Sequence, residues 1–295
     1  MNSPFKKVWK KINAGDNQEK MWNKPEFPHI VDVELTNRCN LRCKMCPTGT
    51  GEHTRRCGFM GYPTFSKLVM ECAKHQTPIR LVRWGEPMLH PDCFRFIRFA
   101  KSQGLAVHMN TNGTLMDDEV VREILLSRLD SIKFSFQGVD SEGYEQWRQG
   151  GNFVSLCGWI KHLYVQRNRT RGRHPHIQVG TTVTSETDLA IDAFRKSMEK
   201  VSDLVTIGKT EEIIRPQERT NPTAPTCPEV FGRLSVNWDG TVTACCRDFN
   251  NLMMLGSLRS ETLTEMWNGA QLQHIRKCLL NNTHSTLPLC GKCFL

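Results

Sequence analysis

The sequence has no apolar run that approaches the roughly 18 residues that a membrane-spanning helix needs. The residues before Val31 mix Lys, Asp, Glu and Pro, and they lack the hydrophobic core of a secretion signal. Low-complexity tracts are also absent, and 39% of the 295 residues are hydrophobic against 23% that are charged, which excludes a fibrous or disordered chain. We therefore expect a soluble, globular, cytoplasmic protein without a membrane partner, large enough for one or two domains.

Acidic residues are fewer than basic ones, 30 against 39, which leaves a net charge of +9. This excess favours an anionic partner, such as a phosphorylated metabolite, a nucleotide sugar or a nucleic acid. Cysteine is abundant, and 13 is an odd number; in a reducing compartment this favours metal ligation over a disulfide framework. The cysteines are grouped, with three inside residues 39–46 and five at positions 227, 245, 246, 290 and 293.

Residues 31–208 alternate short β-branched or apolar runs with longer segments of helical period, a pattern typical of a parallel α/β sheet. Six strands are predicted, starting near Val31, Ile79, Leu105, Ser131, Ile177 and Leu204. In the first predicted helix, Phe65, Leu68, Val69 and Cys72 form an apolar stripe. Six β/α units are too few to close an eight-stranded barrel, so an open, partial barrel or a doubly wound sheet is expected.

The segments on either side of this core differ from it in composition and pattern. Residues 1–30 form a basic extension, whose amphipathic FKKVWKKI piece is expected to pack as a helix over the sheet. Residues 209–226 are polar and punctuated by proline, which predicts a linker. The smaller module at 227–295 should begin with a hairpin, turned at Asp239-Gly240 in a type I′ turn. One helix from about Glu261 to Leu280 and a cysteine-bearing tail follow.

The first cysteine group is CNLRCKMC, directly after the first predicted strand, and it contains Cys39, Cys43 and Cys46. Three thiolates on one tight loop can hold three corners of an iron-sulfur cube and leave the fourth iron without a protein ligand. A structural zinc site would instead need a fourth ligand, for which His53 and Cys57 are the nearby candidates.

The CxxxCxxC spacing after a first strand resembles that of the radical S-adenosylmethionine (radical SAM) enzymes, and the resemblance extends along most of the chain. It implies a partial (β/α)6 TIM-like barrel and a SAM-binding 4Fe-4S cluster on the three cysteines. In that family SAM binds the open iron and yields a 5′-deoxyadenosyl radical, which abstracts hydrogen from the substrate. The resemblance also implies an external reductant, flavodoxin or ferredoxin.

Further residues match the SAM-binding positions of that family. Gly85 and Glu86 resemble the motif that holds the SAM amino group, and Arg148 resembles the arginine that pairs with the SAM carboxylate. Four other positions complete the expected SAM site: Met45, Asn110, Asn112 and Ser135. Several of these follow predicted parallel strands, whose carboxyl ends form the ligand-binding edge of α/β sheets, so they are expected to share one cleft.

The second cysteine group supplies four thiolates, from Cys227, Cys245, Cys290 and Cys293. Four ligands make a closed site, either zinc or a fully ligated iron-sulfur cluster. Beside a radical SAM core, the group resembles the SPASM and twitch subgroup with one auxiliary 4Fe-4S cluster, so two clusters are expected in all. If Cys245 and Cys246 share a strand, their side chains point to opposite faces. The spacing then favours Cys245 as the ligand and leaves Cys246 as a buried thiol or a hydrogen donor.

The resemblance implies a small, carbohydrate-like substrate, a sugar or cyclitol with or without a phosphate group. Two reactions are expected: oxidation of an alcohol, as in the enzyme that dehydrogenates 2-deoxy-scyllo-inosamine, or epimerisation, as in neomycin C epimerase, with Cys246 as hydrogen donor. A peptide-modifying maturase is the alternative within the family. Outside it, an iron-sulfur electron carrier or a nucleic-acid-binding regulator would use the basic run from Arg167, for which a solvated loop is the preferred interpretation.

Overall fold

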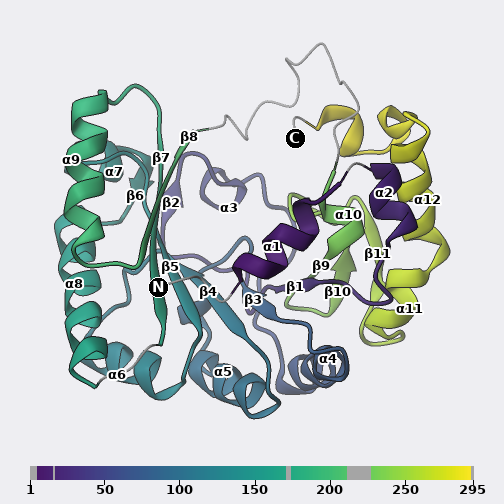
Figure 1. Ribbon diagram of the computed structural model, residues 1–295, viewed down its shortest axis with the longest axis horizontal. Helices are drawn as coiled ribbons and strands as arrows, with labels where there is room; N and C mark the ends of the chain where they lie inside the picture. Colours follow the sequence, from purple (N-terminus) through teal and green to yellow (C-terminus); the bar gives the residue numbers. More distant parts are fainter. Residues whose placement is uncertain (1–4, 16, 171–173, 211–226, 294–295) are drawn as a thin grey trace.

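The computed structural model describes residues 5–15, 17–170, 174–210 and 227–293 (Figure 1). Most of the predicted linker lies outside these ranges. The strands are β1 (Ile30–Val33), β2 (Arg42–Cys43), β3 (Ile79–Leu81), β4 (Val107–Thr111), β5 (Ser131–Ser135), β6 (Arg148–Gln149), β7 (His176–Val183), β8 (Leu204–Lys209), β9 (Arg233–Val236), β10 (Thr241–Thr243) and β11 (Met254–Ser257). The helices are α1 (Lys6–Asn13), α2 (Asn17–Trp22), α3 (Pro47–Thr50), α4 (Tyr62–Lys74), α5 (Cys93–Ser102), α6 (Asp118–Leu126), α7 (Ser141–Trp147), α8 (Phe153–Arg169), α9 (Asp188–Glu199), α10 (Glu229–Gly232), α11 (Leu263–Asn268) and α12 (Ala270–Leu280), with short 3₁₀ turns η1 (Pro87–Leu89), η2 (His284–Thr286) and η3 (Cys290–Lys292).

One sheet organises the described residues, in the strand order β11-β10-β9-β1-β3-β4-β5-β7-β8. The six predicted strands are all present as β1, β3, β4, β5, β7 and β8, and they run parallel in chain order. Helices α4, α5, α6, α8 and α9 cover the outer side, while α1 lies on the inner side (Figure 1). The α/β fold with a mostly parallel, partial TIM-like barrel is therefore confirmed.

The carboxyl-terminal hairpin extends the main sheet, because β9 runs parallel to β1 with Val31 opposite Leu234. Its turn is not the predicted type I′. Gly240 has a positive φ of 88°, but Asp239 does not. The Asn237 N–H donates to the Thr241 carbonyl at 2.8 Å and the Gly240 N–H donates to Asn237 at 2.9 Å, which makes a three-residue loop with glycine in the left-handed position.

The predicted helix from Glu261 to Leu280 is two helices, α11 and α12, which meet at Gly269. A capping box between Thr262 and Glu265 starts α11, because its side chains satisfy the free N–H groups of the first turn. None of the helices in the described ranges combines the length and the apolar character needed to span a bilayer.

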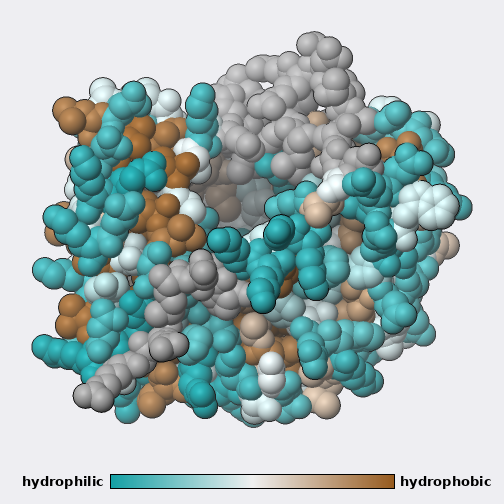
Figure 2. Space-filling view, in the orientation of Figure 1, coloured by the Kyte–Doolittle hydropathy of each residue, from teal (hydrophilic) through white to brown (hydrophobic). Residues whose placement is uncertain are grey.

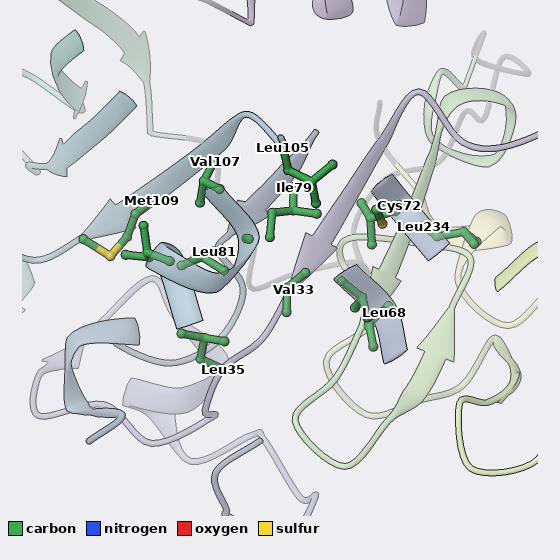
Figure 3. Packing of buried hydrophobic residues seen from close by; sticks show 14 of the residues in the cluster. Val33, Leu35, Leu68, Cys72, Ile79, Leu81, Leu105, Val107, Met109 and Leu234 are labelled. Carbon is green, nitrogen blue, oxygen red and sulfur yellow. The ribbon is translucent and has the colours of Figure 1, made fainter. Parts of the chain in front are cut away.

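The main hydrophobic core lies between the outer face of the sheet and its helices. Figure 3 shows Val33, Leu81 and Met109 from the strands with Leu68 and Cys72 from α4. The predicted α4 stripe is confirmed, since all four of its side chains are fully buried. Side chains alternate along a strand, so the residues between these core positions face the inside of the barrel.

The inner face is largely polar and is closed on one side by α1. Asp32 on β1 accepts two hydrogen bonds of 2.7 Å from Arg80 and one of 3.1 Å from Arg233. The Trp9 ring of α1 lies 4.5 Å from the Arg80 guanidinium and 5.3 Å from that of Arg233, and Ile12 packs against Ile30. The amphipathic extension is thus a packing helix, as predicted, but it packs inside the open barrel.

Arg167, at the start of the basic run, is not a solvated loop residue. It lies in α8 with only 2% of its surface exposed. Its guanidinium forms an ion pair with Asp203 and donates to the Pro175 carbonyl at 2.9 Å. This arginine therefore fastens α8 to the strands beside it, and it offers no charge to a nucleic acid.

Candidate active site

The three cysteines of the first group lie on a loop that a short two-stranded ladder holds in place. Strand β2 contains Cys43 and pairs with β6, which places Cys43 opposite Arg148. The Lys44 N–H donates to the Trp147 carbonyl at 2.9 Å, and the Cys46 N–H donates to the Cys43 carbonyl at 3.2 Å. The ladder therefore fixes Arg148 beside the cysteines. Because each of its strands has only two residues, no sequence pattern predicts this pairing.

The thiols of this trio influence one another and receive polar contacts from neighbours. Burial raises the pKa of Cys39, and it raises the pKa of Cys43 to about 11; the neighbouring cysteines of the trio raise both further. Asn112 Nδ2 lies 3.9 Å from Cys39 Sγ, and Arg148 Nη1 lies 4.0 Å from Cys43 Sγ. Donors directed at the sulfurs are a feature of protein-bound iron-sulfur clusters, so these residues fit such a group.

Gly85 lies directly against the chain segment that leads into the cysteine loop. A Cβ atom here would stand 2.1 Å from the Thr36 carbonyl oxygen and 2.7 Å from that of Arg38. The next residue, Glu86, donates its N–H to the same Arg38 carbonyl at 2.9 Å. Only glycine permits this approach, which brings the end of β3 to the cysteines.

Glu86 is a buried carboxylate, with 2% of its surface exposed. It accepts hydrogen bonds from Thr111 Oγ1 at 2.8 Å, from the Asn112 N–H at 2.7 Å and from the Met88 N–H at 3.1 Å. Burial raises its pKa to about 7, and these donors only partly oppose the shift. No side chain in the described ranges forms an ion pair with it, so a ligand ammonium group would supply the missing positive charge.

Arg148 presents the opposite charge on the other side of the cysteine loop. Its Nη2 donates to the Phe136 carbonyl at 3.3 Å, while its buried Nε has no hydrogen-bond partner among the described residues. An unpaired buried N–H is costly, so this guanidinium fits a carboxylate ligand. Glu86 and Arg148 thus offer a carboxylate and a guanidinium beside the same three thiols.

The other predicted SAM residues are distributed unevenly. Met45 is half-buried between Cys43 and Cys46, and Ser135 is the half-buried last residue of β5. Asn112 reaches the cysteine loop through its bond of 2.9 Å to Asn40. Asn110 does not join this group, because it lies deeper on the inner face of β4.

The alternative zinc site finds no support in the side-chain arrangement. Cys57 is exposed, and His53 lies among Arg55, Glu34 and Arg83, the charged groups that act on its pKa. In the part of the chain that the structure describes, no three His, Cys, Asp or Glu side chains stand close enough to hold one metal ion. An iron-sulfur cube is wider than one ion, and its thiolates stand farther apart.

The carboxyl-terminal cysteines also come near one another. Burial raises the pKa of Cys227 to about 12, and the thiols of Cys290, Cys293 and Cys246 add to the shift. Strand β10 ends at Thr243, so the expected strand alternation does not apply to Cys245 and Cys246. The two thiols instead interact, and this hydrogen bond together with burial raises the pKa of Cys246 well above its usual range. The structure therefore places Cys246 near the other three ligands, and the choice of Cys245 stays a prediction.

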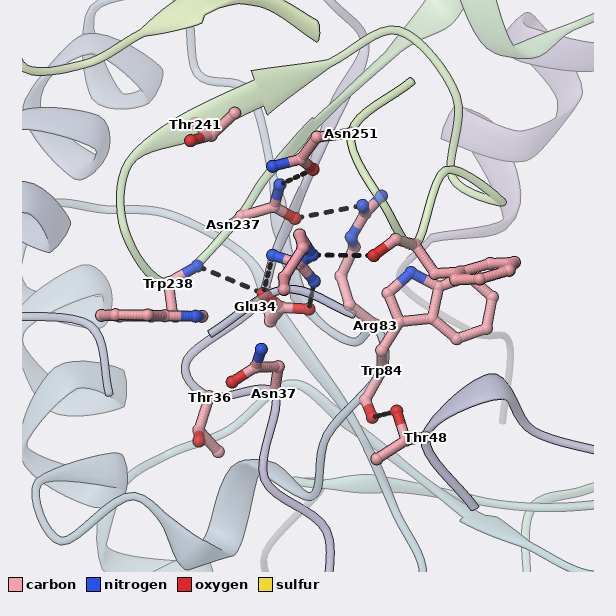
Figure 4. A network of polar contacts seen from close by, with 12 residues as sticks. Glu34, Thr36, Asn37, Thr48, Arg83, Trp84, Asn237, Trp238, Thr241 and Asn251 are labelled. Atoms are coloured by element: carbon pink, nitrogen blue, oxygen red, sulfur yellow. Dashed lines mark hydrogen bonds and ion pairs between the residues drawn. The ribbon is translucent and has the colours of Figure 1, made fainter. Parts of the chain in front are cut away.

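Arg83 connects the SAM-binding side with the loop of Cys245, and Figure 4 shows its guanidinium directed toward Asn237. It follows β3 and precedes Trp84 and Gly85. Its guanidinium donates to the carbonyl of Cys245 at 3.3 Å, to that of Asp248 at 2.9 Å and to Asn237 Oδ1 at 3.1 Å. Nothing in the sequence distinguishes this arginine from a surface residue, so its role as a clamp was not predictable.

Comparison with known proteins identifies the two parts of the chain. Residues 33–164 match the model of the Radical SAM superfamily, and residues 227–294 match that of SPASM, an iron-sulfur cluster-binding domain. The chain carries a radical SAM domain followed by a SPASM domain. It is therefore an enzyme of the radical SAM type, for which a 4Fe-4S cluster and SAM are implied.

Relatives and solved structures are similar over most of the chain. The tungsten-containing aldehyde ferredoxin oxidoreductase cofactor-modifying protein of Pyrococcus furiosus is 25% identical, over 89% of this chain and 86% of its own length. BtrN, solved with AdoMet and 2-DOIA, is 14% identical with a TM-score of 0.63, over 90% of this chain and 93% of BtrN. Streptococcus suis SuiB, bound to its precursor peptide SuiA, is 13% identical with a TM-score of 0.65, over 94% and 72%. At these identities the two structures show a shared fold.

Proposed function

We propose that this radical SAM enzyme abstracts hydrogen from a small, carbohydrate-like molecule and thereby oxidises an alcohol or inverts a carbon centre. The observation that carries the proposal is the convergence of Glu86, Asn112 and Arg148 on the loop of Cys39, Cys43 and Cys46. Among the described residues, Glu86 has no ion-pair partner and the Nε of Arg148 has no hydrogen-bond partner. The cluster and SAM, when bound, supply a carbon radical that can take a hydrogen atom from an unactivated position.

Each residue has a defined task in this proposal. The three cysteines hold the cluster, Glu86 binds the SAM ammonium group, and Arg148 binds the SAM carboxylate. Met45 and Ser135 border the adenosine part. Because Glu86 and Arg148 lie on opposite sides of the cysteine loop, they orient the amino acid end of SAM in one way only. Gly85 makes this possible by letting the backbone after β3 touch the loop.

We assign a second 4Fe-4S cluster to Cys227, Cys290, Cys293 and either Cys245 or Cys246. Oxidation of an alcohol must pass on a second electron after hydrogen abstraction, which is the reason to expect a redox group near the substrate. Flavodoxin or ferredoxin is the proposed reductant. We place the reaction in the reducing cytoplasm, where thirteen cysteines would stay reduced and available as ligands.

A small molecule is the preferred substrate because this chain covers 93% of BtrN, which was solved with 2-DOIA, against 72% of SuiB. Modification of a peptide is the second candidate, and the similarity to SuiB with its bound precursor peptide favours it. Incubation with a panel of amino sugars and sugar phosphates, followed by mass spectrometry, separates oxidation, which removes two hydrogens, from epimerisation, which leaves the mass unchanged.

The radical function is tested with protein purified and reconstituted without oxygen. With SAM and dithionite, the wild type should release 5′-deoxyadenosine, which liquid chromatography detects. The matched control replaces Cys39, Cys43 and Cys46 by alanine and should release none while the iron of the second site is retained. Wild-type protein that contains iron but leaves SAM intact would refute the proposal.

The epimerisation hypothesis requires Cys246 to act as a hydrogen donor, which can be tested separately. If its thiol donates hydrogen to the substrate radical, Cys246→Ala should still release 5′-deoxyadenosine but form no epimer. If Cys246 is a ligand instead, the same change should lower the iron content of the second site. Cys245→Ala is the matched control, and iron analysis of the two variants decides which cysteine is the ligand.

A further inference from the structure

The inside of the open barrel contains a cavity to which the proposed function assigns no role. Its volume is about 540 Å³, which lies within the usual range for small-molecule pockets. Helix α1 closes it with Trp9, and the strands contribute Arg80, His108, Asn110, Lys133 and Gln178. We call this cavity the lumen pocket.

The inner wall of the lumen pocket carries a positive charge, that of Lys133, which no neighbouring carboxylate neutralises among the described residues. Arg80 and Arg233 share the carboxylates of Asp32 and Glu229, so these four groups balance. Lys133, in contrast, has no hydrogen-bond or ion-pair partner among the described residues. Burial, Arg80 and Arg148 lower its pKa. Lys133 is half-buried, and a partly buried cation without a counter-charge is unfavourable unless a ligand supplies that charge.

A chain of hydrogen bonds orients a second donor toward the same space. Gln178 Nε2 donates to Ser131 Oγ at 2.9 Å, and that hydroxyl lies 3.0 Å from His108 Nδ1. His108 Nε2 lies 2.7 Å from Asn110 Oδ1. Burial lowers the pKa of His108 to about 3, so the ring is neutral. Since Asn110 Oδ1 can only accept, the ring hydrogen is on Nε2. The Asn110 amide nitrogen is then free to donate.

Asn110 and Lys133 are neighbours across the sheet. The strand register places Asn110 opposite Lys133, and Lys133 opposite Gln178. Adjacent strands lie about 4.8 Å apart. The end of the Lys133 side chain leans toward Gly180 of β7, and its flexible four-carbon stem can turn the ammonium group toward Asn110, so one small group can contact both donors. We propose that the lumen pocket binds an oxyanion of the substrate, a phosphate or a carboxylate, through Lys133 Nζ and the Asn110 amide. That the ligand is the substrate rests on the proposed function.

The position of the pocket sets the shape of that substrate. Lys133 lies two residues below Ser135 on β5, and Asn110 lies two below Asn112. At 3.3 Å per residue, an anionic group held at the level of the Asn110 amide sits about 7 Å from the predicted SAM site. This is about the span of one sugar ring, so a sugar phosphate or a sugar acid fits the separation. Asn110, predicted to bind SAM, is assigned to the substrate in this scheme.

The test is calorimetric titration of the full, anaerobically reconstituted chain with inorganic phosphate and, separately, with acetate, without SAM or reductant. The wild type should bind at least one of the two anions saturably. Lys133→Met should weaken that binding about tenfold or more, since it removes a charge-assisted hydrogen bond. Lys133→Arg should restore most of it, and Asn110→Ala should weaken it several-fold. Lys161→Met, on the exposed side of α8, removes the same charge elsewhere and should change binding less than twofold.

Tighter binding of phosphate assigns a phosphorylated substrate, and tighter binding of acetate assigns a carboxylate. A wild type that binds neither anion would overturn the proposal, as would unchanged affinity in Lys133→Met and Asn110→Ala. If Lys133→Met does not fold, the affinities of Lys133→Arg and Asn110→Ala for the anion still test the proposed site. Failure of the wild type to cleave SAM would refute the proposed function and leave the anion site standing, because the titration uses neither SAM nor reductant.

Discussion

Substitution of Gly85 by alanine tests whether the contact between β3 and the cysteine loop builds the site. The added Cβ would lie 2.1 Å from the Thr36 carbonyl oxygen, whereas relaxed carbon-oxygen contacts are about 3.3 Å or longer. The obstructing atoms are backbone atoms of the segment that continues into Cys39, so no side chain can turn aside. Overpacking of this kind costs about 1–3 kcal/mol, and we expect the upper end of that range.

The stability loss should be accompanied by loss of the first cluster, because relief of the clash moves the chain just before Cys39. Urea unfolding followed by circular dichroism gives the free energy of unfolding, and iron analysis gives the cluster content. The matched control is Gly158→Ala in α8, where no atom lies within 4 Å of the added Cβ and alanine should stabilise the helix by about 1 kcal/mol. A Gly85→Ala protein with wild-type stability and full iron content would refute the reasoning.

Three further predictions concern charged groups. A SAM ammonium pairs with the Glu86 carboxylate but not with its neutral acid, whose pKa is about 7, so SAM affinity by calorimetry should rise about tenfold per pH unit from pH 5 to 7 and then level off; a wild type with a flat profile would contradict this role. Asp32→Asn removes the carboxylate that pairs with Arg80 and Arg233, and urea unfolding should show a loss of about 3 kcal/mol in the free energy of unfolding; unchanged stability would mean that the ion pairs contribute nothing. Arg83→Met should release the Cys245 loop and lower the iron content of the second site before that of the first, as spectroscopy of the separate clusters would show; equal loss from both would point to general unfolding.

The parallel sheet could be predicted because its strands are long enough to show a pattern. Strands β1, β3, β4, β5 and β7 consist mostly of buried residues, and β8 alternates between exposed and half-buried residues over its first four positions. The helices between them carry apolar stripes such as that of α4. Right-handed connections fit both a partial barrel and a doubly wound sheet, so the strand order did not follow from the pattern, and the family resemblance favoured the barrel. Glu86 and Asn112 were identified from the family resemblance, and the sheet explains their meeting, since residues that follow neighbouring parallel strands lie at one edge.

Contacts between distant segments could not be predicted in this way. The ladder of β2 and β6 has two residues on each side, too few for any period, yet it places Arg148. The pairing of β9 with β1 depends on which sheet edge is free, a property of the whole fold. The Asp239-Gly240 pair indicated a turn correctly, but the loop length, and with it the turn type, is set by the register of β9 with β10.

The pairing of β9 with β1 also explains how two cysteine groups far apart in sequence can serve one reaction. Strand β1 leads into the loop of Cys39, and the hairpin that begins with β9 leads into the loop of Cys245. Because Val31 lies opposite Leu234, β9 has a fixed position beside β1. Strand β10 runs back antiparallel to β9, so the loop of Cys245 leaves toward the opposite end of the strands from the loop of Cys39. Arg83, which follows β3, then ties the Cys245 loop to the segment that carries Glu86. The relation between the two proposed clusters is thus set by the registers of β9 with β1 and with β10 together with this arginine, and the lumen pocket lies on the inner face of the same sheet.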